Sequence, residues 1–396
     1  MKRPRLILVS NALDDKTRLQ RGISTDSPAA SRKVLGLCKA LRMAGVDACV
    51  LSLGRGRADG SLRFHRGFVR RIDGVPVLYA PFARAHLLSH LVSLLAPAWI
   101  LRHTVGQPPR RRTAVLFYNR RLAYTPSLLV ARALGLRTLF DLEDGEVSAR
   151  DGLVAKTRAF LLRRIYDWVC VDGCLLACSA LADMTSARRM SCYYGTWGGA
   201  PPSQRWRSET VTVLLGGTLA EETGVPILVD AIQHLRDNPG PCSRHLRFVI
   251  TGKGPALNAL VRLANEPGFP EVIIRGRLTD HEYDEVLAGC EVGLALKPRG
   301  GHLANTTFPS KVVEMAGAGL LVLTTDISDV RKVLGAGAVY LEEESGAALA
   351  KLLCWVVQQN EEAQTVARLG QKTIEQKCSP RIAGQVVADF LFGSGQ

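Results

Sequence analysis

Long hydrophobic runs are absent from the sequence. None of its apolar stretches reaches the roughly 20 residues that a membrane-spanning helix needs. The N-terminal run MKRPRLILVSNAL is too short for the apolar core of a signal peptide and reads as a first β-strand. We therefore expect a cytoplasmic protein.

A cysteine framework is also missing, since the ten cysteines contain no CxxC pair. Cys170, Cys174 and Cys178 fall four apart, which would place them on one face of a helix. They form either a metal site, although no histidine is near in the sequence, or a set of small buried side chains in a reducing compartment. We adopt the second interpretation for the cysteines. No DxD motif is placed to hold a metal, so we expect neither a metal nor another cofactor.

Acidic side chains are scarce in the first half of the chain. Residues 1–200 hold 32 Lys and Arg against 14 Asp and Glu, whereas residues 201–396 hold 19 against 22. A one-sided excess indicates an anionic partner for the first half, which is a membrane surface, a nucleic acid or an acidic polymer. Aromatic residues make up only 6%, and no motif that interleaves them with arginines is present, so we expect no nucleic acid.

What is present is an alternation of strand-like and helix-like segments. Residues 1–200 and 201–380 each repeat it, and the Gly- and Pro-rich residues 195–209 separate them. This alternation predicts parallel sheets covered by helices, and hence an α/β protein of two Rossmann-like domains facing across a cleft. We expect residues 381–396 to form a tail helix that crosses back to pack on the first domain. Ligands of such sheets bind at the carboxyl ends of the strands.

Three segments of the second half place glycine directly after a strand. LLGGT contains Gly217 and Thr218, VITGKGP contains Gly252 and Lys253, and IIRGR contains Arg277. Glycine would allow a ligand to approach the backbone closely, and the cations would meet a phosphate. The alternative is that these glycines are simple turns and that the lysine is solvated.

The segment FPSKVVEMAGAG predicts a short helix that carries one glutamate among apolar residues. Pro309 suits its first turn, and Gly319 ends it. Amides around Ser310 and Lys311 would attract an anion, while Glu314 would accept hydrogen bonds from two sugar hydroxyls. The alternative is an intrahelical Lys311–Glu314 pair on the surface.

These segments resemble the GT-B glycosyltransferases of group 1 (family 4-like) in order and spacing over about residues 211–330. The matching stretches are GGTLAEETGVPILVDAIQHL, FVITGKGP, IIRGRLTDHEYDEVLAGCEVGLAL and PSKVVEMAGAGLLVLTTD. In the first half the resemblance rests on SPAASRKVLGLCKALRMAGVDACVLSLG and CLLACSALADM. The resemblance implies a nucleoside-diphosphate sugar as donor, bound mostly by the second domain, and an acceptor bound by the first.

The family also implies roles for single residues. Its glutamate that binds the donor ribose corresponds to Glu314, with Ser310 and Lys311 beside the phosphates. A glycine-rich loop after the first strand approaches the donor phosphates in this family, and Gly22, with Ser24 beside it, is the candidate here. Enzymes of this fold generally work without a bound metal.

Three positions depart from the family pattern. A second glutamate often lies eight residues before Glu314, where this chain has Thr306. An arginine and a lysine often neutralise the diphosphate, where this chain has Thr218 and Thr223. A leaving diphosphate needs positive charge, and the cations available to supply it are Lys253, Arg277, Lys297, Arg299 and Lys311. If none of these residues supplies that positive charge, the chain is an inactive relative that binds nucleotide sugar or a partner enzyme.

Four acids follow a strand of the first half in LFDLEDGEVSARDG, namely Asp141, Glu143, Asp144 and Glu146. An inverting transferase needs one carboxylate as a base for the acceptor hydroxyl, whereas a retaining one does not. Asp144 is our first candidate for this base and Asp141 the second. The alternative is that these acids only cap a helix.

The run RAHLLSHLVSLLAPAWILRH is apolar and flanked by arginines, and we expect Pro97 to interrupt it. It forms either a buried helix of the first domain or a helix in a membrane interface, and we expect His86 and His90 to be structural. The interfacial reading places Trp99 at the headgroups and basic side chains on lipid phosphates: Arg84, Arg102, Arg110, Arg111 and Arg112. Together with the basic first half, it predicts a peripheral enzyme on the inner face of the cell membrane. Its acceptor would be a lipid-linked precursor of an envelope polysaccharide.

Overall fold

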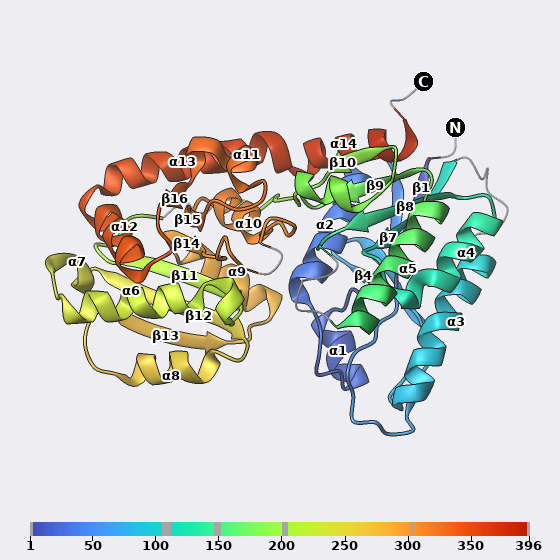
Figure 1. Cartoon of the computed structure of the whole chain (residues 1–396), viewed down its shortest axis with the longest axis horizontal. Helices are drawn as coiled ribbons and strands as arrows, with labels where there is room; N and C mark the ends of the chain where they lie inside the picture. Colours follow the sequence, from blue (N-terminus) through green and yellow to red (C-terminus); the bar gives the residue numbers. More distant parts are fainter. Residues whose placement is uncertain (1–2, 105–111, 146–151, 200–204, 302–303, 394–396) are drawn as a thin grey trace. The chain divides into compact units, whose positions relative to one another are not determined.

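The structure is a computed structural model, and it describes residues 3–104, 112–145, 152–199, 205–301 and 304–393. The chain divides into two compact units. The first unit comprises residues 1–196 and 380–396, and the second comprises residues 197–379. Each unit consists of a sheet covered by helices, which confirms the predicted α/β class (Figure 1).

The first unit is built on an eight-stranded sheet in the order β10-β9-β8-β7-β1-β2-β5-β4. Neighbouring strands are parallel except for β4, which is antiparallel to β5. The strands span Arg5–Ser10 (β1), Asp47–Ser52 (β2), Phe68–Ile72 (β4), Val75–Tyr79 (β5), Thr113–Tyr118 (β7), Arg137–Leu142 (β8), Gly173–Leu176 (β9) and Met190–Cys192 (β10). The order reverses between β1 and β7, and such a switch point leaves a crevice at the carboxyl ends of the strands.

Helices cover both faces of this sheet (Figure 1). They span Asp15–Arg21 (α1), Pro28–Met43 (α2), His86–Thr104 (α3), Thr125–Ala133 (α4), Leu153–Val169 (α5) and Pro380–Phe392 (α14), with 3₁₀ turns at Leu122–Tyr124 (η2) and Ser179–Met184 (η3). A small antiparallel sheet of Phe64–His65 (β3) and Phe82–Ala83 (β6) was not predicted from the sequence.

The helix α3 continues through Pro97, so the expected interruption is wrong. Proline removes one backbone hydrogen bond from a helix. Pro97 lies on the buried side of α3 with Ala98 and Leu101, and this packing offsets the lost bond.

The last helix, α14, belongs to the first unit and packs on α2. A Cβ added to Gly384 would overlap the carbonyl oxygen of Ala40, so only glycine allows this close approach. The guanidinium of Arg137 donates a 2.7 Å hydrogen bond to the carbonyl oxygen of Leu391 at the end of α14. The chain therefore leaves the first unit once and returns to it.

The second unit has a six-stranded sheet in the order β13-β12-β11-β14-β15-β16, and all its pairs are parallel. The strands span Val211–Thr218 (β11), Leu246–Lys253 (β12), Glu271–Gly276 (β13), Val292–Ala295 (β14), Leu321–Thr325 (β15) and Val339–Leu341 (β16). Its order reverses between β11 and β14, which is the switch point of this sheet.

Helices connect the strands of the second unit and follow its last strand. They span Val225–Asp237 (α6), Pro241–Arg244 (α7), Leu257–Asn265 (α8), Asp280–Ala288 (α9), Lys311–Gly317 (α10), Val330–Leu334 (α11), Gly346–Gln358 (α12) and Asn360–Cys378 (α13), with 3₁₀ turns at Glu221–Thr223 (η4) and Gly335–Gly337 (η5). Thr279 caps α9 and forms a capping box with Glu282.

The cysteines differ from expectation in two ways. Cys170 ends α5 and Cys174 lies on β9, so the predicted shared helical face is wrong. Cys242 of α7 and Cys354 of α12 form a disulfide across 112 residues of sequence, so not every cysteine is reduced in the structure. Sequence spacing did not indicate this pair because the two helices meet only in the fold.

Within the described residues, no helix has both the length and the hydrophobicity to cross a lipid bilayer.

Candidate functional site

Glycines bring the ends of β11 and β12 together in the second unit. Gly217 and Thr218 pair in register with Gly252 and Lys253. The φ angle of Gly252 is +124°, and a Cβ there would overlap the carbonyl oxygen of Gly217. Glycine is therefore required for this contact, at the sheet edge where ligands of parallel sheets bind.

The helix α6 begins at the switch point of the same sheet. Gly224 precedes it with a φ angle of +81°, and a Cβ there would overlap the carbonyl oxygen of Leu296, which follows β14. The amino end of α6 is thus fixed beside the ends of β11 and β14, with its positive dipole end toward this edge.

Lys311 reaches the same edge from α10. Its ammonium donates a hydrogen bond to the carbonyl oxygen of Gly216, and a Cβ on Gly217 would overlap the lysine Nζ. A lysine from one helix therefore lies directly over the glycine-rich end of β11. This contact places a positive charge where the backbone is open to close approach.

The short helix α10 also carries Glu314, which is half-buried one turn after Lys311. α10 has only seven residues, and the amide of Ser310 already donates to the carbonyl oxygen of Phe308. The amide of Ser310 is therefore already used within the chain, and the positive charge of this segment is the ammonium of Lys311.

The threonines that replace the family's charged residues supply no charge here. The hydroxyl of Thr223 donates 2.7 and 2.8 Å hydrogen bonds to the carbonyl oxygens of Thr218 and Ala220, and so braces its own loop. The side chain of Thr218 is exposed. The hydroxyl oxygen of Thr306 is buried without a hydrogen-bond partner among the described residues.

Other cations gather at the carboxyl edge of the second sheet. Lys253 ends β12, Arg277 follows β13 and Lys297 follows β14. Because the strands are parallel, these residues share one edge. Arg299 is committed elsewhere, since its guanidinium donates to Glu344 at 3.2 Å and to the carbonyl oxygen of Leu341 at 2.8 Å.

The first unit has a cavity of about 670 Å³ at its own switch point. Residues that follow β1, β2 and β7 line it, among them Asn11, Arg55, Arg57, Asn119 and Arg121. A second cavity of about 450 Å³ shares Arg55, Asn119 and Arg121 with the first. The carboxyl ends of three strands thus open onto one strongly basic space.

The two predicted catalytic acids occupy different environments. Asp144 lines both cavities of the first unit. Asp141 is only 1% exposed on β8. Burial, and then the negative charge of Glu143, raises the pKa of Asp141 well above its ordinary value. Of these two acids, Asp144 lines a cavity and Asp141 is buried.

A buried ion pair lies beside Asp141. The ammonium of Lys33 on α2 pairs with the carboxylate of Glu143, which also accepts a 3.2 Å hydrogen bond from the hydroxyl of Tyr118. Burial lowers the pKa of Lys33, but the charges of Glu143 and Asp141 outweigh it and the pKa is raised overall. Lys33 thus stays charged within the interior. Glu146 lies outside the described residues.

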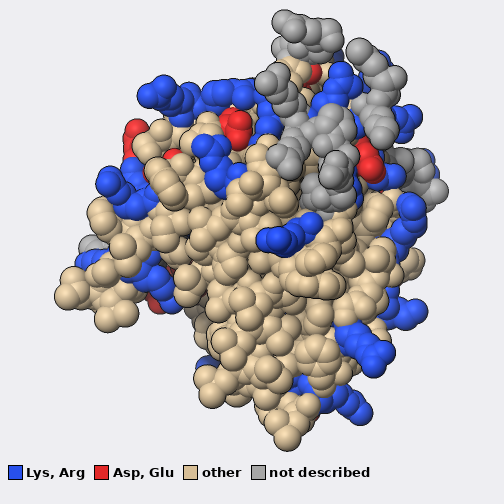
Figure 2. Space-filling model, turned by 90° about the vertical axis from the view of Figure 1, so that its right-hand side faces the viewer, with Lys and Arg blue, Asp and Glu red and all other residues tan. Residues whose placement is uncertain are grey.

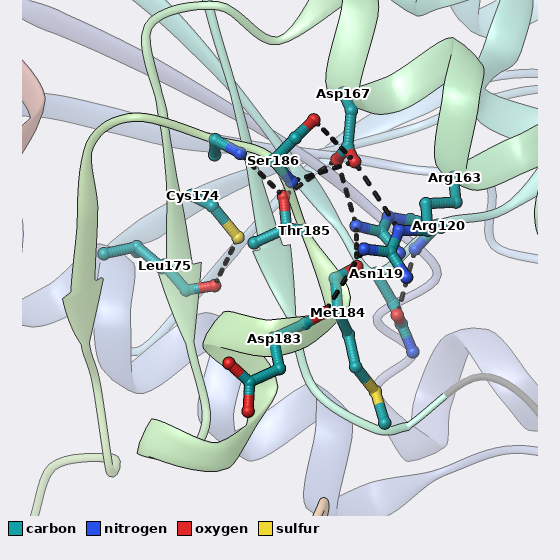
Figure 3. A network of polar contacts seen from close by, with 11 residues as sticks. Asn119, Arg120, Arg163, Asp167, Cys174, Leu175, Asp183, Met184, Thr185 and Ser186 are labelled. Carbon is teal, nitrogen blue, oxygen red and sulfur yellow. Dashed lines mark hydrogen bonds and ion pairs between the residues drawn. The ribbon is translucent and has the colours of Figure 1, made fainter.

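A second polar network fixes the loop that carries Arg121 (Figure 3). Arg120 pairs with Asp167 at 3.1 Å, and both side chains are almost fully buried. Asp167 in turn accepts hydrogen bonds from Thr185 and Ser186. The hydroxyl of Tyr166 bonds both the amide and the carbonyl of Arg121. The backbone of Arg121 is therefore held by α5 and η3 while its side chain is exposed.

Gly22 and Arg84 lie against each other inside the first unit. Gly22 has a φ angle of +63° and ends α1, and a Cβ on it would meet the guanidinium of Arg84 at 2.8 Å. Arg84 pairs with Asp59 at 2.9 Å, and its side chain is 11% exposed. Gly22 thus has a packing role, and Arg84 does not lie on an exposed face.

The helix α3 has one exposed apolar side, formed by Leu87, Leu91, Leu95 and Trp99. Trp99 is 63% exposed, and its ring packs against that of His103 in a tilted arrangement, with the centroids 4.4 Å apart. Figure 2 shows the side of the molecule that contains α3 and α4, with Lys and Arg side chains around a broad area free of charge.

The predicted basic residues near this face are only partly described. Arg102 is exposed in the last turn of α3, and Arg112 is exposed before β7. Arg110 and Arg111 lie outside the described residues.

The sequence prediction missed the cationic lining of the first unit's cavities. Arg55 and Arg57 follow β2 in the run LGRGRADG, and Arg121 follows β7 in the run YNRRLAY. Both runs place arginines directly after a parallel strand, which is the signal that was available. His86 and His90 were expected to be structural but are exposed and line the larger cavity.

No cluster of three or more His, Cys, Asp or Glu side chains that suits a metal ion occurs among the residues that the structure describes.

Comparison with known proteins locates the chain in a family. Residues 210–359 match the family model described as Glycosyl transferases group 1. No curated protein matches the chain.

Solved structures match over the whole chain. TarM superposes with a TM-score of 0.67 at 8% identity and covers 100% of this chain and 99% of its own. HepE of Anabaena, solved with UDP and glucose, superposes with a TM-score of 0.67 at 15% identity, covering 97% of this chain and 98% of its own. The sucrose-phosphate synthase of Thermosynechococcus elongatus gives a TM-score of 0.67 at 12% identity, covering 98% of each chain.

The chain thus has the GT-B fold of these solved structures. Residues 210–359 thus carry the sequence pattern of the group 1 glycosyltransferases. The family resemblance inferred from four short segments is confirmed.

Proposed function

We propose that the protein transfers a sugar from a nucleoside-diphosphate sugar to an acceptor. The observation that carries this proposal is the contact of Lys311 with the carbonyl oxygen of Gly216 at the strand ends of the second unit. A donor diphosphate would lie along the glycines beside Lys311 and Lys253, and its ribose would bind Glu314. UDP is the first nucleotide to test, because structures of HepE and TarM contain it.

The reaction replaces one bond of the anomeric carbon with another. The bond to the diphosphate oxygen breaks, and a bond to the acceptor oxygen forms. The leaving diphosphate gains negative charge, which Lys253 and Lys311 stabilise in place of the cations missing at Thr218 and Thr223. Asp144 takes the proton of the acceptor hydroxyl.

A thermal-shift panel of UDP, GDP, ADP and their sugar conjugates tests donor binding. We expect one nucleotide to stabilise the protein, because a ligand that binds only the native state raises its stability. Glu314→Ala should abolish the shift, whereas Glu362→Ala, at an exposed glutamate of α13 in the same unit, should not. No shift with any nucleotide would contradict the proposal.

Transfer of labelled sugar to a lipid extract tests activity. We expect Asp144→Asn to lower the rate by about 10²- to 10⁴-fold, which is the usual contribution of a general base. Nucleotide binding without transfer to any acceptor would instead identify the chain as an inactive relative that only binds the donor.

We also propose that the acceptor is lipid-linked and is met at the cytoplasmic face of the cell membrane, in the synthesis of an envelope polysaccharide. The exposed side of α3 carries Leu91, Leu95 and Trp99, each more than half exposed, and ends in Arg102. Apolar side chains with a tryptophan and flanking arginines suit an interface of anionic lipid.

The helix α5 adds a second apolar stripe to the first unit. Val154, Leu161 and Trp168 are spaced seven residues apart, so they share one helical side, and Trp168 is 77% exposed. Arg164 is exposed on the same helix. The excess of positive charge in residues 1–200 gives this unit the sign that an anionic bilayer attracts.

Vesicle flotation tests the membrane proposal. Leu91→Glu combined with Trp99→Glu should release the protein from vesicles of phosphatidylglycerol and phosphatidylcholine. Leu369→Glu, an equally simple change at an exposed leucine of the second unit, should not. High salt should also weaken binding, because it screens the attraction to anionic headgroups. Binding that survives the double substitution would contradict the use of this face.

A further inference from the structure

The larger cavity of the first unit has an excess of cations for which the protein offers few counter-charges. Arg55, Arg57 and Arg121 line it, together with His86 and His90, against the two carboxylates Asp26 and Asp144. Within the described parts of the chain, none of these three arginines forms an ion pair with a carboxylate. Guanidinium groups gathered without counter-charges favour an anionic ligand.

Arg55 is the most enclosed of these cations. Its guanidinium donates to the hydroxyl of Ser93 and lies 3.5 Å from the ring of His90. Burial, and to a smaller extent the charge of nearby Arg121, lowers the pKa of Arg55. The guanidinium groups of Arg55 and Arg121 thus repel each other, and an anion bound between them would relieve this repulsion.

The backbone that carries these arginines is held in place. The amide of Arg55 donates to the side chain of Asn11, which in turn donates to the carbonyl oxygen of Arg55. The amide of Arg57 donates to the hydroxyl of Thr25 at 2.8 Å. A Cβ on Gly56, between the two arginines, would overlap the carbonyl oxygen of Thr25. This loop is therefore set before any ligand arrives, as is the loop of Arg121.

The helix α3 connects this cavity with the exposed apolar face. His86, Ser89 and His90 line the larger cavity, and Ser93 lines the neighbouring one. These positions share one side of the helix by their spacing of three and four residues. Leu91, Leu95 and Trp99 are exposed on the other side. One helix thus borders a cationic cavity and an apolar surface at the same time.

We propose that this cavity binds the phosphate or diphosphate group of an amphiphilic acceptor, whose lipid chain lies along the exposed side of α3. Arg57 and Arg121 hold the phosphate oxygens from two loops, and Arg55 contacts them from the more enclosed part of the cavity. This inference rests on the proposed function in taking the first unit as the acceptor site, and it adds the chemical class of the acceptor.

Calorimetric titration of the full-length protein with farnesyl diphosphate tests the inference, with the donor site saturated by the nucleotide that stabilises it. We expect Arg57→Gln combined with Arg121→Gln to weaken binding by about a hundredfold or more, because each of the two lost charge-assisted contacts to phosphate is worth about tenfold or more. Arg71→Gln, an exposed arginine of β4 outside the cavity lining, is the matched control and should leave binding unchanged.

Farnesol and inorganic diphosphate separate the two parts of the ligand. We expect both to bind more weakly than farnesyl diphosphate, because each lacks one half of the interaction. Inorganic diphosphate that binds as tightly as farnesyl diphosphate would overturn the amphiphilic acceptor and indicate a soluble phosphate compound.

The donor site provides the check on the proposed function itself. Arginine variants that keep their nucleotide-induced stabilisation but lose farnesyl diphosphate support the inference and show that they are folded. Farnesyl diphosphate binding that is insensitive to these arginines would overturn the inference while leaving donor binding intact. Glu314→Ala should lose the nucleotide and keep farnesyl diphosphate.

Discussion

Lys33 and Glu143 form an ion pair in the interior of the first unit, with side chains that are only 8% and 12% exposed. The pair joins α2 to the end of β8, and Tyr118 adds a hydrogen bond from the end of β7. It therefore ties a helix to the sheet edge on which the larger cavity opens.

Removing one partner of this pair should destabilise the protein strongly. Lys33→Met leaves the carboxylate of Glu143 buried without its cation, and we expect the free energy of unfolding to fall by about 3–5 kcal/mol. Urea unfolding followed by fluorescence measures this loss. The double substitution Lys33→Met with Glu143→Leu should recover most of it, because no buried charge remains. A loss below about 1 kcal/mol in the single variant would contradict an interior pair.

Asp141 should make stability fall with rising pH. Burial, and then the charge of Glu143, raises its pKa above the unfolded value of 3.8, so the native state keeps a proton that the unfolded chain releases. Its stabilising contribution is complete below pH 3.8 and is lost as the pH rises toward the native pKa. Asp141→Asn removes this dependence, so the variant should gain stability over the original protein as the pH increases from 4 to 7. A pH-independent difference between the two proteins would disprove the raised pKa.

Gly252→Ala should separate backbone strain from steric overlap. Gly252 and Gly268 have similar φ angles of +124° and +119°, but only Gly252 would place a Cβ against another backbone atom. We expect Gly268→Ala to cost about 1–3 kcal/mol through strain alone. Gly252→Ala should cost about 1–3 kcal/mol more through overpacking and should also weaken nucleotide binding. Equal stability and equal nucleotide affinity in the two variants would argue against a role for this contact.

The disulfide between Cys242 and Cys354 should stabilise the second unit. It closes a loop of 112 residues, and we expect Cys354→Ala to lower the free energy of unfolding by about 2–4 kcal/mol in oxidised protein. A reducing agent should remove the difference between the two proteins. Mass spectrometry of the alkylated protein shows whether the bond is present in the purified sample. A difference that persists under reduction would assign the effect to packing instead.

The second unit could be predicted well because its signals are local. Positive φ angles occur at Gly217 and Gly252, near the ends of β11 and β12, and at Gly224, directly before α6. The capping box of α9 lies within the four consecutive residues from Thr279 to Glu282. Each of these features needs only neighbouring residues, so the sequence alone displays them.

The first unit was harder to predict because its site depends on contacts between distant segments. Lys33 and Glu143 are 110 residues apart in sequence, and nothing near either residue indicates the other. Asp141 and Asp144 look alike in sequence, but Asp141 is buried on β8 whereas Asp144 lines the larger cavity. The arginines of the larger cavity come from separate loops that only the strand order brings together.

The return of α14 to the first unit makes the second unit an insert with adjoining ends. Its first residue, Trp197, donates a 3.0 Å hydrogen bond from its amide to the carbonyl oxygen of Cys378, one residue before the unit ends. The chain therefore enters and leaves the second unit at adjacent positions. Under the proposed function, exchanging residues 197–379 between relatives would change the sugar-donor preference and leave the first unit unchanged, with only two junctions to engineer.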